Sequence, residues 1–259
     1  MHEPDRVSVR HDARHVAWLT IENAAKLNTL NRATMTALVD AAQRLAQDEA
    51  LRAVVLRGAG DRAFIGGADI AEMATLNAAA ARDFITLVHQ SCDAFRRIPV
   101  PVIAAIQGWT LGAGLEVAAA CDLRIATSTA KFGMPEVRVG VPSVVEAALL
   151  PRLIGWGRTR RLLLTGETID AATALSWGLV EDAVAPGSLD AAVEKALSAI
   201  LASGPRAIRL QKALIADWET LALGAAIQRG IDSFATAWET DEPRALMQRF
   251  LEFQRQRKR

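Results

Sequence analysis

Between residues 102 and 126, two short apolar segments flank a run of small residues, and this pattern restricts the fold most strongly. Residues 102–106 and 123–126 have the length and composition of buried strands. Between them, residues 108–122 begin with glycines and continue as an alanine-rich apolar segment that predicts a helix. Strand, helix and strand in this order indicate an α/β core with mostly buried strands.

The same alternation extends along most of the chain. Residues 7–9 and 16–21 predict a hairpin, and residues 70–97 have an apolar stripe that predicts one helix. Pro142 fits the first turn of a further helix that would continue through Leu153. The chain has helical character throughout from residue 204. We therefore expect an α/β core over residues 1–203 and a C-terminal helical region over residues 204–259.

Composition excludes several classes of protein. Hydrophobic residues make up 51% of the 259 residues and the net charge is +1, which argues against a nucleic-acid binder driven by charge. No apolar run approaches the roughly 18 residues of a membrane span, and residues 1–6 lack the apolar core of a secretory signal. Cys92 and Cys121 have no metal-ligand spacing and are expected to be reduced. These observations predict a cytoplasmic protein without membrane or nucleic-acid partners.

Two acids are candidate catalytic groups. Glu116 lies inside an apolar run, so its carboxyl is expected to be buried, and such burial needs a reason. Glu136 alone would be typical of a solvated loop, but two carboxyls at one site divide acid and base work. The glycine-rich turns at residues 63–70 and 108–116 leave N–H groups free to hold an anion. Each segment alone is compatible with ordinary packing; together they indicate an enzyme acting beside a polarised carbonyl.

Taken together, these segments resemble the crotonase superfamily, the enoyl-CoA hydratase/isomerase family. The resemblance covers about residues 7–253 and is carried by residues 26–30, 64–70, 108–122, 132–142, 164–167 and 174–180. It implies a crotonase-like spiral core of ββα units followed by a C-terminal helical region. It also implies an acyl-CoA thioester substrate, whose coenzyme A is part of the substrate, and no metal or separate cofactor.

The resemblance also implies roles for individual residues. The backbone N–H groups of Ala68 and Ala113 are expected to form an oxyanion hole for the thioester oxygen. Glu116 and Glu136 fill both positions that the family's hydratases use, with Glu136 as the expected proton donor and Glu116 holding the water, although the sequence does not decide this division. The residues expected to bind coenzyme A or substrate are Lys26, Leu27, Gly66, Asp69, Ile70 and Ser143.

This chain departs from the family pattern after Pro142. Ser143 stands where many hydratases have glycine, and the bulkier Val144 and Val145 are expected to reshape the acyl pocket. Glu146 is either a third acid near the site or, as favoured here, a surface or structural residue. Ala113 replaces a common glycine, which matters only if that position requires a positive φ.

The reaction predicted from the glutamate pair is hydration of a 2-enoyl-CoA to the 3-hydroxyacyl-CoA. The alternatives are another acyl-CoA reaction of the family (3,2-enoyl-CoA isomerase, hydrolase or decarboxylase) and a non-catalytic assembly or RNA-binding member. Only the basic run at residues 255–259 favours RNA. By analogy with the family we expect a homotrimer or a dimer of trimers. The large apolar residues expected to meet a neighbouring subunit are Trp218, Phe234, Trp238, Phe250 and Phe253.

Overall fold

The structure, a computed structural model, describes residues 6–257. The predictions for residues 1–5 and for the last two residues of the basic C-terminal run lie outside the described residues. By compactness the chain divides into two units, Met1–Ala196 and Leu197–Arg259. This division lies inside α7 (Leu189–Ala202), whereas the boundary predicted at residue 204 lies directly before α8 (Pro205–Trp218).

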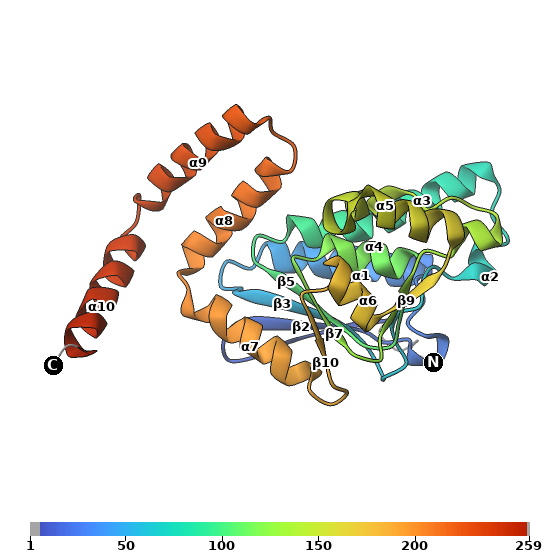
Figure 1. Cartoon of the computed structure of the whole chain (residues 1–259), viewed down its shortest axis with the longest axis horizontal. Coiled ribbons are helices and arrows are strands. Elements are labelled where there is room, and N and C mark those ends of the chain that lie inside the picture. Colours follow the sequence, from blue (N-terminus) through green and yellow to red (C-terminus); the bar gives the residue numbers. More distant parts are fainter. Residues whose placement is uncertain (1–5, 258–259) are drawn as a thin grey trace. The chain divides into compact units, whose positions relative to one another are not determined.

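The first unit contains two sheets of short strands (Figure 1). The six-stranded sheet has the order β1-β2-β3-β5-β7-β10, formed by Val7–His11, Val16–Ile21, Ala53–Gly58, Val102–Ile106, Leu123–Thr127 and Asp182–Val184. The four-stranded sheet has the order β4-β6-β8-β9, formed by Ala63–Ile65, Trp109–Leu111, Lys131–Gly133 and Thr168–Asp170. The pairs β1–β2 and β8–β9 are antiparallel, and all other neighbours are parallel.

Successive pairs of strands join the two sheets in turn. The chain adds β3, β5 and β7 to the large sheet and β4, β6 and β8 to the small one, with a helical segment after each of the first two pairs. This is the spiral of ββα units that the resemblance implied, and the expected α/β fold class is confirmed. The hairpin is also confirmed, since β1 pairs with β2 in register from Val7 opposite Ile21.

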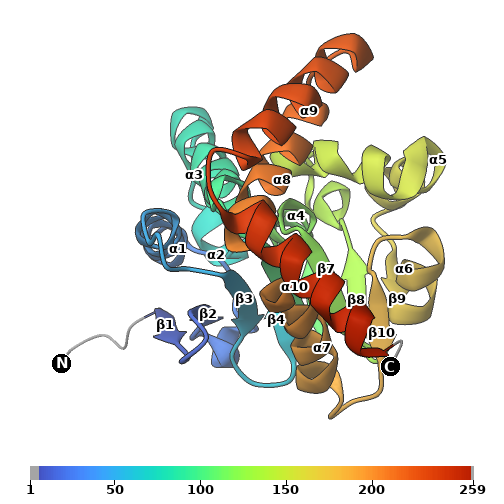
Figure 2. The same cartoon turned by 90° about the vertical axis from the view of Figure 1, so that its left-hand side faces the viewer.

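Helices cover one face of the large sheet. Helices α1 (Arg32–Ala46), α3 (Ala78–Arg97) and α4 (Ala113–Ala120) lie on the same side of it, with α1 and α3 in contact (Figures 1 and 2). The Asn31 side chain accepts a hydrogen bond from the Thr34 N–H at 2.9 Å, which caps α1. The remaining helices of this unit are α2 (Ile70–Met73), α5 (Leu150–Thr165) and α6 (Ala171–Trp177), with 3₁₀ turns η1 (Ala24–Lys26), η2 (Glu136–Val139) and η3 (Val145–Leu149).

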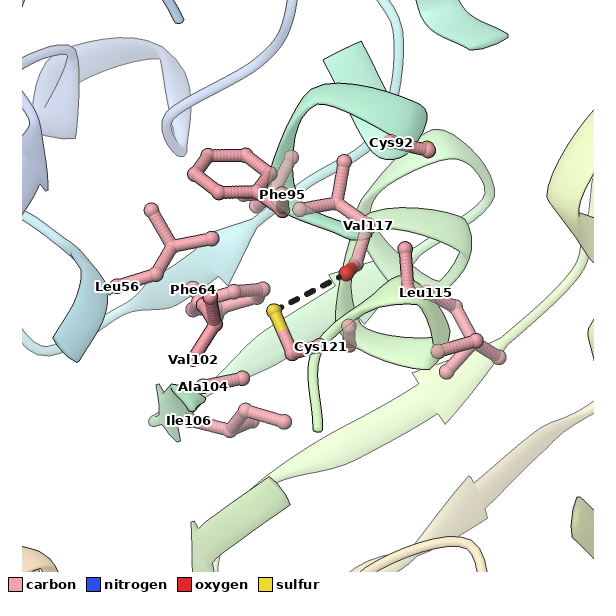
Figure 3. Packing of buried hydrophobic residues seen from close by; sticks show 14 of the residues in the cluster. Leu56, Phe64, Cys92, Phe95, Val102, Ala104, Ile106, Leu115, Val117 and Cys121 are labelled. Carbon is pink, nitrogen blue, oxygen red and sulfur yellow. Dashed lines mark hydrogen bonds between the residues drawn. The ribbon is translucent and has the colours of Figure 1, made fainter. Parts of the chain in front are cut away.

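The core lies between α3, α4 and the large sheet. Figure 3 shows Leu115 and Val117 of α4 among buried side chains from β3, β4, β5 and α3. Cys121 donates its thiol hydrogen to the Val117 carbonyl oxygen at 3.3 Å. Both Cys92 and Cys121 are buried free thiols, as expected. Burial of this small-residue helix on all sides explains why its sequence is apolar throughout.

Two predicted helices differ in the structure. Residues 70–97 form α2 and α3 rather than one helix, because the Asn77 side chain accepts a hydrogen bond from the Ala80 N–H and starts a new helix. The helix predicted to start at Pro142 is also wrong. Val144 is extended and Val145 has a φ of 38°, so regular helix begins only at Leu150.

The second unit is helical, as predicted for the C-terminal region. After α7 it contains α8, α9 (Leu223–Ala237) and α10 (Glu242–Arg257). Within this unit α8 and α9 pack against each other, and the Trp218 indole N–H donates to the Ala226 carbonyl oxygen at 3.2 Å. No helix among residues 6–257 is long and apolar enough to cross a membrane.

Candidate active site

A cavity of about 480 Å³ opens between the start of α4, the turn before α2, one face of α3 and the η2 segment. Six residues selected from the sequence line it: Gly66, Ala68, Ile70, Ala113, Glu116 and Glu136. Most of its remaining wall is apolar, with Met73, Phe84, Val88, Leu111, Val139, Val141 and Val144 among the lining residues. The structure thus brings the two candidate oxyanion donors and the two candidate acids into one largely apolar cavity.

The turn around Ala68 is held by the backbone on both sides. Leu30 N–H donates to the Gly67 carbonyl oxygen, and Asp69 N–H donates to the Leu30 carbonyl oxygen, each at 2.9 Å. Gly67 has a φ of 109°, a conformation that favours glycine. These contacts leave the Ala68 N–H without a hydrogen-bond acceptor among the described residues.

The N–H of Ala113 is the second free donor of the cavity. Gly112 has a φ of 51° and donates its N–H to the Gly133 carbonyl oxygen at 2.9 Å, which fixes the start of α4 beside β8. Ala113 is the first residue of α4, where an N–H has no partner within the helix. The positive φ falls on Gly112 and not on Ala113, so alanine meets no backbone strain at this position.

Glu116 is buried in the first turn of α4, as its apolar surroundings predicted. The residue is only 3% exposed, and its Oε1 accepts a hydrogen bond from the Ala147 N–H at 3.2 Å. Burial raises the pKa of Glu116 to about 8, and the nearby Glu136 carboxyl adds to this increase. Burial therefore favours the protonated form of Glu116 in the substrate-free protein.

Glu136 begins η2 and reaches back toward the start of α4. A Cβ atom placed on Gly112 would lie 2.4 Å from Glu136 Oε1, so only glycine leaves room for this carboxyl. Ser143 donates its hydroxyl to Glu136 Oε2 at 2.7 Å. Ser143 does not itself line the cavity, but it contacts the catalytic candidate Glu136, which does.

The other predicted binding residues lie behind the cavity wall. Leu27, with a φ of 55°, accepts a hydrogen bond from the Gly66 N–H at 2.8 Å and so supports the turn before Ala68. Lys26 ends the η1 turn next to it. The Asp69 side chain accepts hydrogen bonds from the N–H groups of Ala71 and Glu72 and caps α2. None of Lys26, Leu27 and Asp69 lines the cavity of the isolated chain.

The structure also identifies residues that the sequence did not select. Val88 and Phe84 of α3 line the cavity, and His89, next to Val88, pairs with Glu146. Glu146 is only 8% exposed, so the surface interpretation of this residue is wrong. The helical spacing of Phe84 and Val88 indicated a buried face but not which one faced the substrate. Among residues 6–257, no group of three or more His, Cys, Asp or Glu side chains is arranged to hold a metal ion.

The buried Glu116 makes stability depend on pH. The unfolded chain loses this proton near the ordinary pKa of 4.5, whereas the folded protein keeps it to about pH 8. The folded state therefore binds more protons in this range, and the free energy of unfolding falls as pH rises through it. We expect Glu116→Gln to gain stability relative to wild type between about pH 5 and about pH 9, by at most about 5 kcal/mol at 1.36 kcal/mol per pH unit. Urea unfolding at both pH values checks this, and a constant difference would contradict it.

Two acids beside two free N–H donors in a largely apolar cavity define an enzyme that acts on a substrate with an activated carbonyl. Comparison with known proteins agrees with this class. The family model described as enoyl-CoA hydratase/isomerase matches residues 12–258. The chain belongs to this family, which is part of the crotonase superfamily.

Individual relatives are similar over nearly their whole length. A crotonyl-CoA hydratase of Syntrophomonas wolfei is 37% identical over 238 residues, which are 92% of each chain. A short-chain-enoyl-CoA hydratase of Clostridium acetobutylicum is 35% identical over 92% of this chain and 91% of the relative. The crystal structure of an enoyl-CoA hydratase from Mycobacterium smegmatis has a TM-score of 0.93 at 32% identity and covers 96% of this chain and 97% of its own.

Proposed function

We propose that this protein hydrates 2-enoyl-CoA thioesters to 3-hydroxyacyl-CoA. The observation that carries this proposal is the meeting of Glu116, Glu136 and the free N–H groups of Ala68 and Ala113 in one cavity. Hydration needs all of these groups, because a base, an acid and a stabilised oxyanion must act on the same conjugated thioester. The names of the two hydratase relatives support the same reaction.

The two N–H groups would hold the thioester oxygen as it gains negative charge. Ala68 lies in the turn before α2 and Ala113 is the first residue of α4, and a single donor of this kind is worth about 2.7–4 kcal/mol of transition-state stabilisation. Drawing electron density onto that oxygen makes C3 of the enoyl group electrophilic. Water then attacks C3, and the resulting enolate accepts a proton at C2.

The carboxyl pair would supply the base and the acid. Water attack requires one ionised carboxyl, and protonation at C2 requires one protonated carboxyl. Burial favours a proton on Glu116 in the substrate-free protein. Since the two carboxyls are coupled, this proton belongs to the pair as a unit. The expected division, in which Glu136 protonates C2 and Glu116 holds the water, requires this proton to move from Glu116 to Glu136 when substrate binds, and it stays a prediction.

The apolar wall supports an uncharged, hydrocarbon-like acyl group. Val139, Val141 and Val144 face the cavity from the segment beyond Glu136. Val144 lines the cavity, as the bulky substitution suggested, whereas Val145 packs against the core. Coenzyme A enters the proposal as part of the substrate, and no separate cofactor is required by the proposed steps.

We also infer that the chain assembles as a homotrimer or a dimer of trimers. In the second unit five large apolar side chains are exposed: Trp218, Phe234, Trp238, Phe250 and Phe253. Light scattering at micromolar concentration tests this, and a monomer would contradict it. The cytoplasmic location expected from the sequence stays a prediction.

The direct test of the reaction is the absorbance of the conjugated thioester. Purified wild-type protein is expected to decrease the enoyl-thioester absorbance of crotonyl-CoA, with 3-hydroxybutyryl-CoA as the product identified by mass spectrometry. An isomerase, a hydrolase or a decarboxylase would give no hydrated product. If no hydrated product forms with crotonyl-CoA or with longer and bulkier enoyl-CoA thioesters, the proposed reaction is wrong.

A further inference from the structure

Glu146 is a buried acid that the proposed reaction does not use. It lies in η3, is 8% exposed, and its Oε1 is 2.8 Å from Nδ1 of His89 on α3. Its second oxygen, Oε2, is buried without a hydrogen-bond partner among the described residues. Taking a carboxylate out of water costs several kcal/mol, and one contact to a half-exposed histidine offsets only part of this cost. Such a group requires an explanation.

The residues on both sides of Glu146 contact the cavity or one of its acids. Val144, two residues before it, lines the cavity, and Ala147, the residue after it, donates its N–H to Glu116. Val145 has a φ of 38°, a strained conformation for a β-branched residue. Surrounding contacts must hold this strained turn in place. The pair of Glu146 with His89 is a side-chain contact from η3 to α3 that serves this purpose.

Glu146 is also close enough to the catalytic candidates for its charge to act on them. The titratable groups that face Glu116 are Glu136 on η2, Glu146 on η3 and Cys92 on α3. Burial and Glu136 raise the pKa of Glu116 most, and the Glu146 charge raises it further. The adjacent strands β4 and β6 carry no titratable side chain.

The pKa of the Cys92 thiol, on α3, is affected by the same two acids, Glu146 and Glu116. Burial raises its pKa first, followed by the charges of Glu146 and then Glu116, with Cys121 and a hydrogen bond to the Glu146 side chain also contributing. A buried thiol stays neutral here and adds no charge of its own. Glu146, which pairs with His89, is therefore the acid behind Glu116 that has no proposed chemical role.

We propose that Glu146 and His89 form a positioning pair for Glu116, which holds the η3 backbone, and with it the Ala147 N–H, against the Glu116 carboxyl and keeps the Glu146 side chain behind it. This inference rests on the proposed function. In this arrangement Glu146 touches no reacting atom and acts only through Glu116. The pair connects α3 with η3, residues 57 positions apart in sequence.

The test compares Glu146→Gln with wild type by direct titration of Glu116. NMR of protein labelled with ¹³C at glutamate carboxyls measures the ionisation of Glu116 without substrate, with Glu116→Gln identifying its signal. Removing the Glu146 charge while keeping its shape is expected to lower the titration midpoint of Glu116 by at least about half a pH unit. The pH profile of kcat/KM for crotonyl-CoA is expected to move its alkaline limb in the same direction.

Two further variants separate charge from structure. His89→Gln leaves the Glu146 charge in place, so the Glu116 midpoint is expected not to fall. Glu181→Gln removes the carboxylate that pairs with Arg124, whose guanidinium binds the Cys121 carbonyl at the other end of α4, and is expected to leave the midpoint unchanged. An unchanged Glu116 midpoint in folded Glu146→Gln would overturn the proposal. Because the NMR titration needs no turnover, this result is distinct from a failure of the proposed hydration.

Discussion

Glu136→Gln is expected to lose at least about 100-fold in kcat for hydration of crotonyl-CoA. The amide keeps the size of the side chain and still accepts a hydrogen bond from Ser143, but it neither ionises nor transfers a proton. General acid–base help of one positioned group is worth about 100- to 10,000-fold. The initial rate of absorbance loss at saturating substrate measures the effect, because kcat separates chemistry from binding.

Two comparisons make this result specific. Glu116→Gln is expected to show a loss of similar size, since the reaction needs both members of the pair. Glu49→Gln alters an exposed acid in the turn before β3 and is expected to keep wild-type turnover. A wild-type kcat in Glu136→Gln would contradict the mechanism with two glutamates, while the fold and the family would be unaffected.

The large sheet was predictable because its strands carry strong local signals. Residues 53–56, 102–106 and 123–126 are short apolar runs, and each forms a strand buried on both faces. The small sheet was not predictable in the same way. Each of its strands is three residues long, too short for a periodic pattern, and their pairing depends on segments far apart in sequence.

The site was predictable only in part. A glutamate inside the apolar run of α4 identified Glu116 as buried, because the hydrophobic pattern leaves that position no route to water. Glu136 looks like an ordinary loop acid, and the resemblance to a family was needed to select it. The contact of Glu146 with His89 spans 57 positions and arises only from the packing of η3 against α3. Nothing local in either segment indicated it.

The segment after Pro142 shows how a correct local rule can fail. Proline suits the first turn of a helix, and residues 145–153 contain good helix formers. In the structure, Val145 instead adopts a positive φ, and the Ala147 N–H donates both to the Val144 carbonyl oxygen at 2.9 Å and to the Glu116 carboxyl at 3.2 Å. Helix propensity amounts to only a few tenths of a kcal/mol per residue, so tertiary contacts outweigh it here. Local strain of this kind is concentrated at functional sites.

Ala113→Pro is expected to lower kcat for crotonyl-CoA hydration by about 100- to 1,000-fold, the effect of deleting one oxyanion donor. Ala113 is the first residue of α4, the one helical position that accepts proline readily, because its N–H has no partner within the helix. The substitution therefore deletes the proposed donor while leaving the intrahelical hydrogen bonds of α4 intact.

The same substitution at another helix start provides the matched control. Leu223 is the exposed first residue of α9, and Leu223→Pro is expected to keep both kcat and the melting temperature. If Ala113→Pro loses activity and also unfolds, the lost activity is a consequence of lower stability, and its melting temperature falls below that of Leu223→Pro. If it stays folded with wild-type kcat, the Ala113 N–H does not stabilise the oxyanion, and another donor must be sought beside Ala68. A folded protein with a reduced kcat would tie the free N–H at the start of α4 to the charge that develops on the thioester oxygen.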